Sequence, residues 1–453
     1  MELRVTHAND RPVQTHGDYV LYWMIAARRA AWSFALDHAL ALAKQLGRPL
    51  LVLEALRVGY PWASDRLHRF VMDGMADNAK AFAAAGITYM PYLEPEPGAG
   101  KGLVEALAKR ACAIVTDEYP GFFLPHMIGA LAARVDVRVD LVDGCGVYPL
   151  RAFGKQFVVA RSFRKAWHEV PHLSQMPAGH LRVPRVARDA DVPGAILRRW
   201  KSARVIDDIP IDHDVPPVAY AGGSVAARAT LEDFVDNRLA RYAERSHPDA
   251  DAASGLSPYL HFGHISAHEI VARVGPHAEQ FLDELITWRE LGFNFCFHRR
   301  DVDKLTALPA WAQATLKKHA KDPRPERYTL AELAEARTGD PVWNAAQRQL
   351  LVEGRIHNYL RMLWGKKILE WSASPAQALA NMIELNNKYA VDGRDPSSYN
   401  GILWTLGLFD RPWGPERKIF GTVRYMSSTA TVKKLRMKQY LARWGATAPS
   451  SGR

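Results

Sequence analysis

Buried strands and amphipathic helices alternate along the first 145 residues. Five short apolar runs have the length and composition of buried strands, and stretches with apolar positions every three or four residues separate them. This alternation predicts a parallel sheet covered on both faces, the doubly wound, Rossmann-like α/β architecture. The predicted strands are YVLYWM (19–24), PLLVLEAL (49–56), ITYMPYL (87–93), AIVTDE (113–118) and VRVDLVD (137–143).

The pattern changes twice after residue 145. From about 180 to 225, Pro, Gly and Asp dominate, which predicts a long connector with one helix around 195–203. From 226 onward apolar positions recur at about 3.6 residues, and no strand is predicted. We therefore predict an α/β domain at 1–175, a linker at 176–225 and an all-helical domain at 226–453.

Length and charge narrow the classes of protein that fit. A chain of 453 residues is too long for one ordinary core, so two domains are expected. Lys and Arg number 59 against 48 Asp and Glu, and the net charge of +11 favours a polyanionic partner such as nucleic acid. A merely solvated surface is the alternative explanation for this excess.

Cysteine usage and hydropathy indicate the compartment. Cys112, Cys145 and Cys296 lie far apart and form no CxxC pair, which excludes a disulfide scaffold and an ordinary zinc ribbon. The N-terminal stretch is polar, and the longest apolar run, Tyr19–Ala27, is too short to span a bilayer. These features predict a cytoplasmic protein without a membrane partner, associated with the nucleoid if the host is bacterial.

Candidate chemistry concentrates in the helical part, which holds most of the 13 tryptophans. Glu284 and Trp288 are four residues apart, so both project from one helix face, where a carboxyl and an indole can combine hydrogen bonding with stacking. Trp364 and Trp371 are seven residues apart, about 10.5 Å along a helix axis. Core packing is the ordinary alternative for both pairs.

A phosphate site is a further candidate. Ser257 precedes Pro258, as an N-cap precedes a proline at the first helical position, and Ser254 adds a hydroxyl upstream. The free N–H groups of a helix N-terminus can hold a phosphate, although most capped helices bind nothing.

Two other patterns carry weaker chemistry. His261, His264 and His268 share a predicted helix face and could ligate a metal, but no cysteine accompanies them, and we expect no metal site. The run PGAGKG (97–102) lacks the first glycine and the final Ser or Thr of a P-loop, so that motif is excluded.

The ordered motifs of the chain resemble those of class II cyclobutane-pyrimidine-dimer photolyases, a branch of the photolyase/cryptochrome family. The resemblance covers most of the sequence. It is carried by YWM (22–24), AGGSVAA (221–227), the segment Ser254–Ser266, ELITWRE (284–290), WNAAQRQL (343–350), RIHNYLRMLWGKKILEW (355–371), LNNKYAVDGRDP (385–396) and FDRPWGPERKIFGTVRYM (409–426).

The resemblance implies light-driven repair of pyrimidine dimers in duplex or single-stranded DNA. The implied enzyme is a monomeric carbon–carbon lyase with non-covalent FAD, active as the reduced anion. The implied flavin contacts are Tyr242, Ser254, Gly255, Leu256, Ser257, Arg289, Asn358, Arg361, Asn386, Asp392, Gly393 and Asp395.

The resemblance also implies how the lesion is handled. Trp288 and Trp404 flank the flipped-out dimer, and Glu284 hydrogen-bonds it and stabilises its radical anion. Asn386 takes the catalytic position against flavin N5, and Arg411 contacts the DNA.

A second implied function is electron supply. Trp343 and Trp364 match a dyad that leads from the flavin to the surface, with Trp371 beside it. Photoreduction by this route keeps the cofactor usable but is separate from repair.

Departures from the family pattern leave alternatives open. Class II members read YWMxRDQR where this chain reads YWMIAARR, so Ala26 and Ala27 leave a second, antenna chromophore and its identity undecided. The alternatives are a cryptochrome-like flavin photoreceptor, a homologue with altered or lost repair activity, and a basic DNA-binding protein with a vestigial flavin. The short tail disfavours the photoreceptor.

Overall fold

The computed structural model describes residues 2–171 and 189–445, so part of the predicted linker (176–188) lies outside the described residues. The chain divides into two compact units. Unit 1 comprises Met1–Lys155, Ala166–Asp233 and Gly255–Ala278, and unit 2 comprises Gln156–Lys165, Phe234–Ser254 and Glu279–Arg453. The three consecutive segments expected from the sequence differ from these units, because packing joins segments that are distant along the chain.

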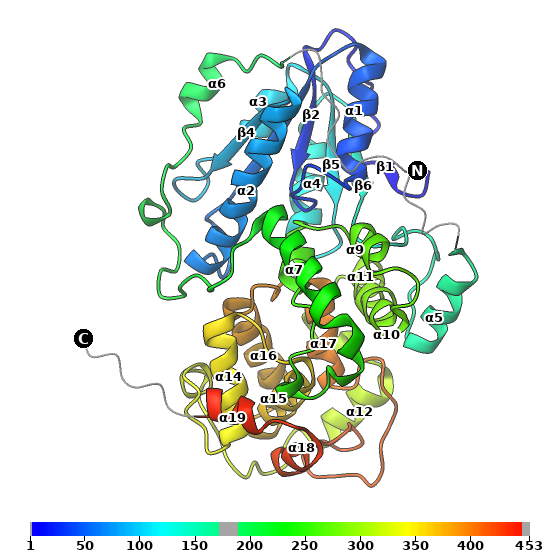
Figure 1. Cartoon of the computed structure of the whole chain (residues 1–453), viewed down its shortest axis with the longest axis vertical. Helices are drawn as coiled ribbons and strands as arrows, with labels where there is room; N and C mark the ends of the chain where they lie inside the picture. The colour runs from blue at the N-terminus through cyan, green and yellow to red at the C-terminus, as the bar shows by residue number, and fades with distance from the viewer. Residues whose placement is uncertain (1, 172–188, 446–453) are drawn as a thin grey trace. The chain divides into compact units, whose positions relative to one another are not determined.

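Unit 1 is built on a six-stranded sheet with the order β1-β6-β5-β2-β3-β4 (Figure 1). The pairings among β2 to β6 are parallel, as predicted, but β1 pairs antiparallel with β6. This edge strand was not predicted, because three residues are too few to show a period. The strands are β1 (Val5–His7), β2 (Tyr19–Met24), β3 (Leu50–Leu56), β4 (Thr88–Leu93), β5 (Ala111–Glu118) and β6 (Val139–Asp143).

The central strand β2 shows why helices cover both faces. All of its residues are buried, and alternate side chains enter two different cores. Helices α1 and α2 contribute to the core that receives Val20 and Tyr22, whereas α3, α4 and α6 contribute to the core that receives Leu21 and Trp23. The doubly wound architecture is therefore confirmed. These helices are α1 (Phe34–Leu46), α2 (Asp65–Ala85), α3 (Leu103–Ala108), α4 (Leu124–Ala132) and α6 (Gly194–Arg199).

The helix predicted around 195–203 is α6, which is shorter than expected because Trp200 leaves the helical conformation. Further helical elements belong to unit 1 or cross its bounds: α5 (Ala160–His168), η2 (Ile206–Asp208), α7 (Gly223–Asn237), α8 (Ser257–His261) and α9 (Ala267–Val274).

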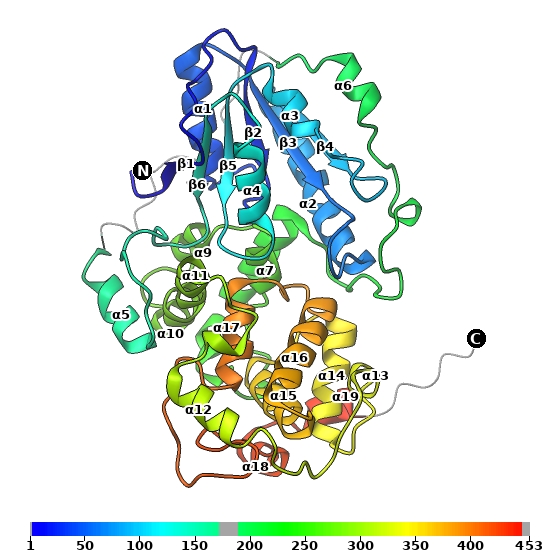
Figure 2. The ribbon, with the colours of Figure 1, turned by 180° about the vertical axis from the view of Figure 1, so that it is seen from behind.

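Unit 2 is helical, and within the described residues its β-pairing is limited to an isolated bridge between Arg417 and Gly421 (Figure 2). The predicted helical character of this part is confirmed. Its elements are η3 (Leu239–Glu244), η4 (Pro248–Ala250), α10 (Glu279–Leu282), η5 (Asp283–Trp288), α11 (Arg289–His298), η6 (Leu305–Ala307), α12 (Ala310–Lys318), α13 (Leu330–Ala334), α14 (Pro341–Glu353), α15 (Asn358–Trp371), α16 (Pro375–Tyr389), α17 (Pro396–Thr405), α18 (Ser428–Lys434) and α19 (Lys438–Trp444).

Two long helical patterns are interrupted in the structure. Over 278–295 the apolar residues recur at helical spacing, but the structure inserts the π-helix η5 there. The wider turn of a π-helix is frequent at functional sites. The pattern over 345–372 breaks at Gly354, which ends α14 with a φ of 63°, a conformation that suits glycine. Among the described helices, none has both the length and the apolar character needed to cross a membrane.

Candidate active site in the helical unit

Two half-buried tryptophans of unit 2 stack on each other. Trp288 ends η5 and Trp404 lies in the last turn of α17, with their ring centroids 4.6 Å apart and their planes at 10°. Gly292 allows α11 to approach α17, because a Cβ there would lie 2.9 Å from the Cα of Ser397. The rings contact each other, so no dimer fits between them in this arrangement, and flanking of the dimer by Trp288 and Trp404 stays a prediction. The indoles form one double layer, and a flat group would stack on its outer face.

The predicted acid Glu284 is held by an arginine. Arg245 Nη2 donates to Glu284 Oε1 at 2.7 Å, and the Arg245 guanidinium lies 4.8 Å from the ring centre of Tyr242. Tyr242 also packs edge-on against Phe281 at 5.3 Å. Burial, aided by the nearby Glu284, raises the pKa of Tyr242 well above its usual value, so it remains a neutral hydroxyl. Tyr242 and Glu284 therefore belong to one cluster joined by Arg245.

The start of the π-helix is anchored separately. Arg164 donates two hydrogen bonds to the Asp283 carboxylate, at 2.6 and 2.7 Å, and Thr287 Oγ1 donates to it at 2.7 Å. Burial acts to raise the pKa of Asp283, but these hydrogen bonds outweigh it and hold the pKa below its usual value. Asp283 is therefore an ionised anchor immediately before Glu284.

A second polar cluster joins α15, α16 and α17. Arg361 Nη1 donates to Asn386 Oδ1 and to Ser398 Oγ, each at 3.2 Å, and its Nη2 lies 3.6 Å from Asp392 Oδ1. Asn386 Nδ2 in turn donates to the Gly393 carbonyl at 2.7 Å and to Ser398 Oγ at 2.9 Å. The predicted residues Arg361, Asn386 and Asp392 are thus brought together, and Ser398 is an addition that the motifs did not single out.

One oxygen of this cluster has an ion-pair partner but makes no hydrogen bond. Asp392 Oδ1 is buried without a hydrogen bond, and its separation from Arg361 exceeds hydrogen-bond length. Buried acceptors are normally satisfied, so the position suits a donor supplied by a bound molecule.

The three remaining predicted tryptophans form a buried cluster. Trp343, Trp364 and Trp371 are 0%, 2% and 3% exposed. Trp343 and Trp364 are nearly parallel, at 4° and 6.4 Å between centroids, and Trp371 meets Trp343 edge-on at 5.4 Å. Both nitrogens of the parallel pair are bonded: Trp343 Nε1 donates to the Trp364 carbonyl at 3.0 Å, and Trp364 Nε1 donates to Gln347 Oε1 at 2.9 Å.

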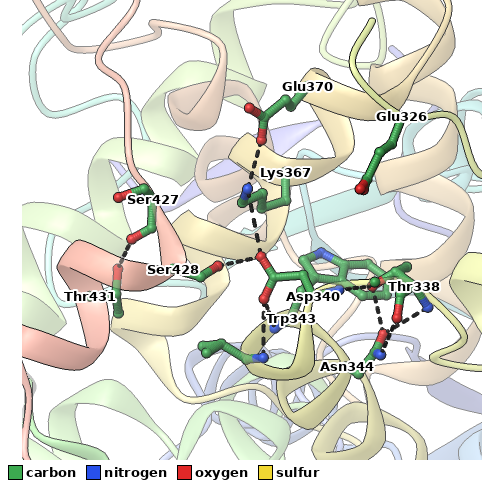
Figure 3. A network of polar contacts seen from close by, with 12 residues as sticks. Glu326, Thr338, Asp340, Trp343, Asn344, Lys367, Glu370, Ser427, Ser428 and Thr431 are labelled. Atoms are coloured by element: carbon green, nitrogen blue, oxygen red, sulfur yellow. Dashed lines mark hydrogen bonds and ion pairs between the residues drawn. The ribbon is translucent and has the colours of Figure 1, made fainter.

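A polar network fixes the helix that carries Trp343 (Figure 3). Asp340 Oδ1 accepts the backbone N–H groups of Val342 and Trp343 at 3.1 and 3.0 Å, which caps α14. Its Oδ2 accepts from Ser428 Oγ at 2.5 Å and lies 3.6 Å from Lys367 Nζ. Asp340 therefore links the start of α14, which carries Trp343, to α15 and α18.

Several predicted cofactor residues have other observed roles. Ser257 is exposed and is the first residue of α8, whose N-cap is Leu256; the prediction of Ser257 as the N-cap is therefore wrong by one position. The bounds of the two units fall between Ser254 and Gly255, where Gly255 has a φ of 73°. The 254–257 segment stays a predicted cofactor contact.

The other predicted contacts lie in unit 2. Asp395 caps α17 by accepting the Ser397 N–H at 2.8 Å, and Gly393 permits close packing, because a Cβ there would lie 2.4 Å from the Asn386 carbonyl oxygen. The Arg289 guanidinium lies 4.3 Å from the ring centre of Phe293. Asn358 is exposed at the start of α15. The flavin contacts predicted for these residues stay predictions.

An exposed basic loop follows α17. The guanidinium groups of Arg411 and Arg424 lie 4.6 and 5.0 Å from the ring centre of Trp413, and that of Arg417 lies 4.9 Å from the ring centre of Tyr425. Arginines beside aromatic rings suit contact with a nucleic-acid strand.

The three histidines do not share one helix face as predicted, because α8 ends at His261, α9 begins at Ala267 and His264 lies between them; His264 and His268 have packing roles in unit 1. Gly223 N–H donates to His264 Nδ1 at 2.8 Å, and burial lowers the pKa of His264 to about 3, so the imidazole stays neutral. His268 packs edge-on against Phe34 at 5.2 Å. Over residues 2–171 and 189–445, no group of three or more His, Cys, Asp or Glu residues is arranged to hold a metal ion.

Besides Ser398, Gln347 and Arg245 escaped sequence reasoning. Gln347 lies four residues after Trp343 on α14 and accepts from the Trp364 indole. Its spacing from Trp343 puts a polar residue on the same helix face as a buried indole, and this spacing could have been noticed in the sequence. Arg245 carries no such signal, because its partner Glu284 is 39 residues away along the chain.

Relatives of known family match this chain over most of its length. The chain is 34% identical to a deoxyribodipyrimidine photo-lyase of Methanothermobacter thermautotrophicus, over 97% of each chain. It is 35% identical to one of Oryza sativa, over 94% of this chain and 87% of the relative. The chain belongs to the photolyase/cryptochrome family. No family model matches it.

Solved structures of photolyase-family proteins share this fold at low identity. A cryptochrome of Synechocystis matches with a TM-score of 0.73 at 15% identity, over 94% of this chain and 88% of the other. A Sulfolobus tokodaii photolyase described with two FAD molecules matches with a TM-score of 0.67 at 16% identity, over 94% and 90%. The predicted fold class is thereby confirmed.

Proposed function

We propose that this chain is a class II deoxyribodipyrimidine photo-lyase, which uses light to split cyclobutane pyrimidine dimers in DNA. Relatives that carry the name of this activity match it over nearly its whole length. The observation in the molecule that supports the proposal best is the stacked Trp288–Trp404 pair, with Glu284 on the same π-helix as Trp288. A flipped-out base needs an aromatic surface to stack on and polar groups at its edge.

FAD is the proposed cofactor, held without a covalent bond. The pyrimidine edge of a flavin offers an imide N–H donor between two carbonyl acceptors. The orphaned Asp392 Oδ1 fits such a donor, and Arg361 supplies donors beside it, so these residues and Asn386 would hold the ring. When bound and reduced, FAD supplies the electron that light transfers to the dimer. A second chromophore stays a prediction.

The lesion-binding role falls to the aromatic layer and the Glu284 pair. A dimer would stack on the outer face of the Trp288–Trp404 layer, with its imide N–H groups directed at an acceptor. Glu284, paired with Arg245, offers carboxylate oxygen as that acceptor. The positive charge of Arg245 would act where the dimer carries its extra electron, which stabilises the reacting state more than the ground state.

The buried indoles are the proposed route for electron supply. Trp364 and Trp343 present parallel rings at 6.4 Å, and Trp371 extends the cluster. The hydrogen bonds to their indole nitrogens and the Asp340 cap hold these rings in one arrangement. They would pass electrons to the cofactor before repair.

Damaged DNA is the proposed partner. The net charge of +11 and the exposed basic loop with Arg411 suit a phosphate backbone. A monomeric state and a cytoplasmic location stay predictions.

The deciding experiment is illuminated turnover. Protein loaded with FAD and chemically reduced is mixed with an oligonucleotide that contains one thymine dimer, and restored thymines are counted with and without blue light. We expect repair in the light only. Bound FAD without repair would favour the photoreceptor alternative. A protein that cannot be loaded with FAD would contradict the proposal as a whole.

A further inference from the structure

A lysine lies in the core of unit 2 and has no role in the function proposed above. Lys366, on α15, is 1% exposed, and its Nζ donates to the Thr405 carbonyl at 2.5 Å. An ammonium group is costly to bury unless it is hydrogen-bonded. Burial lowers the pKa of Lys366 to about 7, against an attraction from Asp410.

The acceptor of this bond is the last residue of α17. The final carbonyls of a helix lack partners within the helix, and a cation there also interacts favourably with the helix dipole. The two helices approach each other closely here, because a Cβ on Gly365 would lie 2.6 Å from Thr405 Cγ2. Beyond Thr405 the chain turns through Gly407, with a φ of 111°. The N–H groups of Gly407 and Leu408 donate to the carbonyls of Trp404 and Leu403, each at 3.1 Å, and the Thr405 carbonyl is the one that accepts from Lys366.

The residue before Thr405 is Trp404, whose indole stacks on Trp288. We propose that Lys366 is a positioning residue: its ammonium group fixes the last turn of α17 and thereby keeps Trp404 stacked on Trp288 as the surface that receives the lesion. The lesion part of this inference rests on the proposed function, whereas the stacking part does not.

The charges around Lys366 determine how the contact responds to pH. Asp410, after α17, attracts the ammonium, and Arg424 repels it. As pH rises through about 7, the ammonium becomes an amine and the charge-assisted bond to Thr405 weakens. The stacking of Trp404 should therefore loosen in this range.

Global stability should change in the opposite direction. The unfolded lysine has a pKa of about 10.4, above the folded value, so the unfolded chain binds more protons between the two values. This group therefore makes the fold more stable as pH rises from about 7 to about 10. If the whole structure loosened as pH rises, the stacking of Trp404 on Trp288 and the free energy of unfolding would instead fall together.

The test compares Lys366→Met with Lys367→Met. The two changes are chemically identical and adjacent, but Lys367 pairs with Glu370 and Asp340 instead of Thr405. The first readout is the near-ultraviolet circular dichroism of the Trp288–Trp404 pair, assigned as the part of the spectrum lost in Trp404→Phe. The second is the affinity for dimer-containing over intact oligonucleotide, from about pH 6 to pH 9.

We expect Lys366→Met to lose most of the pair signal, to bind the dimer about fivefold to thirtyfold more weakly, and to show no pH dependence near 7. Lys367→Met should keep the pair signal and the preference for the dimer, because Lys367 contacts Asp340, Glu370 and Trp371 in the electron-supply cluster and not the Trp288–Trp404 pair; photoreduction is not a readout of this test. An unchanged pair signal in Lys366→Met would overturn the inference.

If Lys366→Met does not fold, the parental protein provides the test. A pair signal that stays constant from about pH 6 to pH 9 would also overturn the inference. A parental chain with no preference for the dimer would instead contradict the proposed function, and the pair signal would still decide the role of Lys366.

Discussion

Trp343, Trp364 and Trp371 are at most 3% exposed, whereas Trp288 and Trp404, in the same helical unit, are only half-buried. The buried indoles are held by hydrogen bonds to their nitrogens and by a helix cap. The half-buried pair is held by stacking between its two rings and, at Trp288 alone, by a side-chain hydrogen bond to Asp283. Tryptophan therefore has two structural roles in this unit: three indoles form a fixed, buried cluster, and two form a stacking surface with one exposed face.

The first test of this comparison is how much each kind of tryptophan contributes to the stability of the fold. Trp364→Ala should lower the free energy of unfolding by about 3–5 kcal/mol, because it empties a buried site and removes the donor to Gln347 Oε1. Trp404→Ala should cost about 1 kcal/mol or less, because its ring is already partly exposed. Urea unfolding of both variants measures the difference, and equal losses would contradict the contrast.

The second contrast is lesion affinity. Trp404→Ala should weaken binding of a dimer-containing oligonucleotide by about 1–3 kcal/mol, the range for losing an aromatic stacking surface. Trp371→Phe, which changes the buried cluster, serves as the control and should bind the dimer as the parental chain does. Unchanged binding by Trp404→Ala would mean that the lesion site lies elsewhere.

The third contrast is electron supply. Trp364→Phe keeps an aromatic ring in the core but removes a readily oxidised indole, so photoreduction of bound FAD should slow roughly tenfold or more, about 1.4 kcal/mol on a barrier. Repair by chemically pre-reduced protein should persist. Flash photolysis and repair assays on one preparation separate the two, and equal loss of both would make Trp364 purely structural.

A smaller effect is expected at Glu284. Glu284→Gln keeps the shape but removes the charge, so dimer affinity should stay within about threefold, while repair yield per absorbed photon falls. The reason is that the Glu284–Arg245 pair acts most when charge appears on the dimer. A parental yield in this variant would place the acid elsewhere.

The smallest effect concerns pH. The folded pKa of Asp283 lies below its unfolded value, so its pair with Arg164 stabilises the fold above about pH 4 and this contribution is lost as pH falls through the folded pKa. The pair is partly exposed, so Arg164→Met should cost about 1 kcal/mol or less at pH 7. Unfolding measured at about pH 6 and about pH 3 should show the gap closing; a gap of the same size at both values would contradict the assignment.

The architecture and the family were within reach of the sequence. Strand and helix periods are local signals, so the doubly wound sheet and the helical second part were readable without contacts. The motifs around Glu284, Arg361 and Trp364 are short runs of adjacent residues, which is why the resemblance could be recognised. The short antiparallel strand β1 and the π-helix η5 were missed, because three residues show no period and a six-residue π segment inside a longer helix is too short to show a period of its own.

Tertiary structure decided how these residues act. The pairing of Glu284 with Arg245, the stacking of Trp288 on Trp404 and the bond from Lys366 to Thr405 join residues between 39 and 116 positions apart, counted from their numbers. Such contacts leave no periodic trace, because they depend on how helices pack rather than on any local preference. The sequence alone determined which chemical groups are present; the packing of η3, η5, α15 and α17 determined which of them meet.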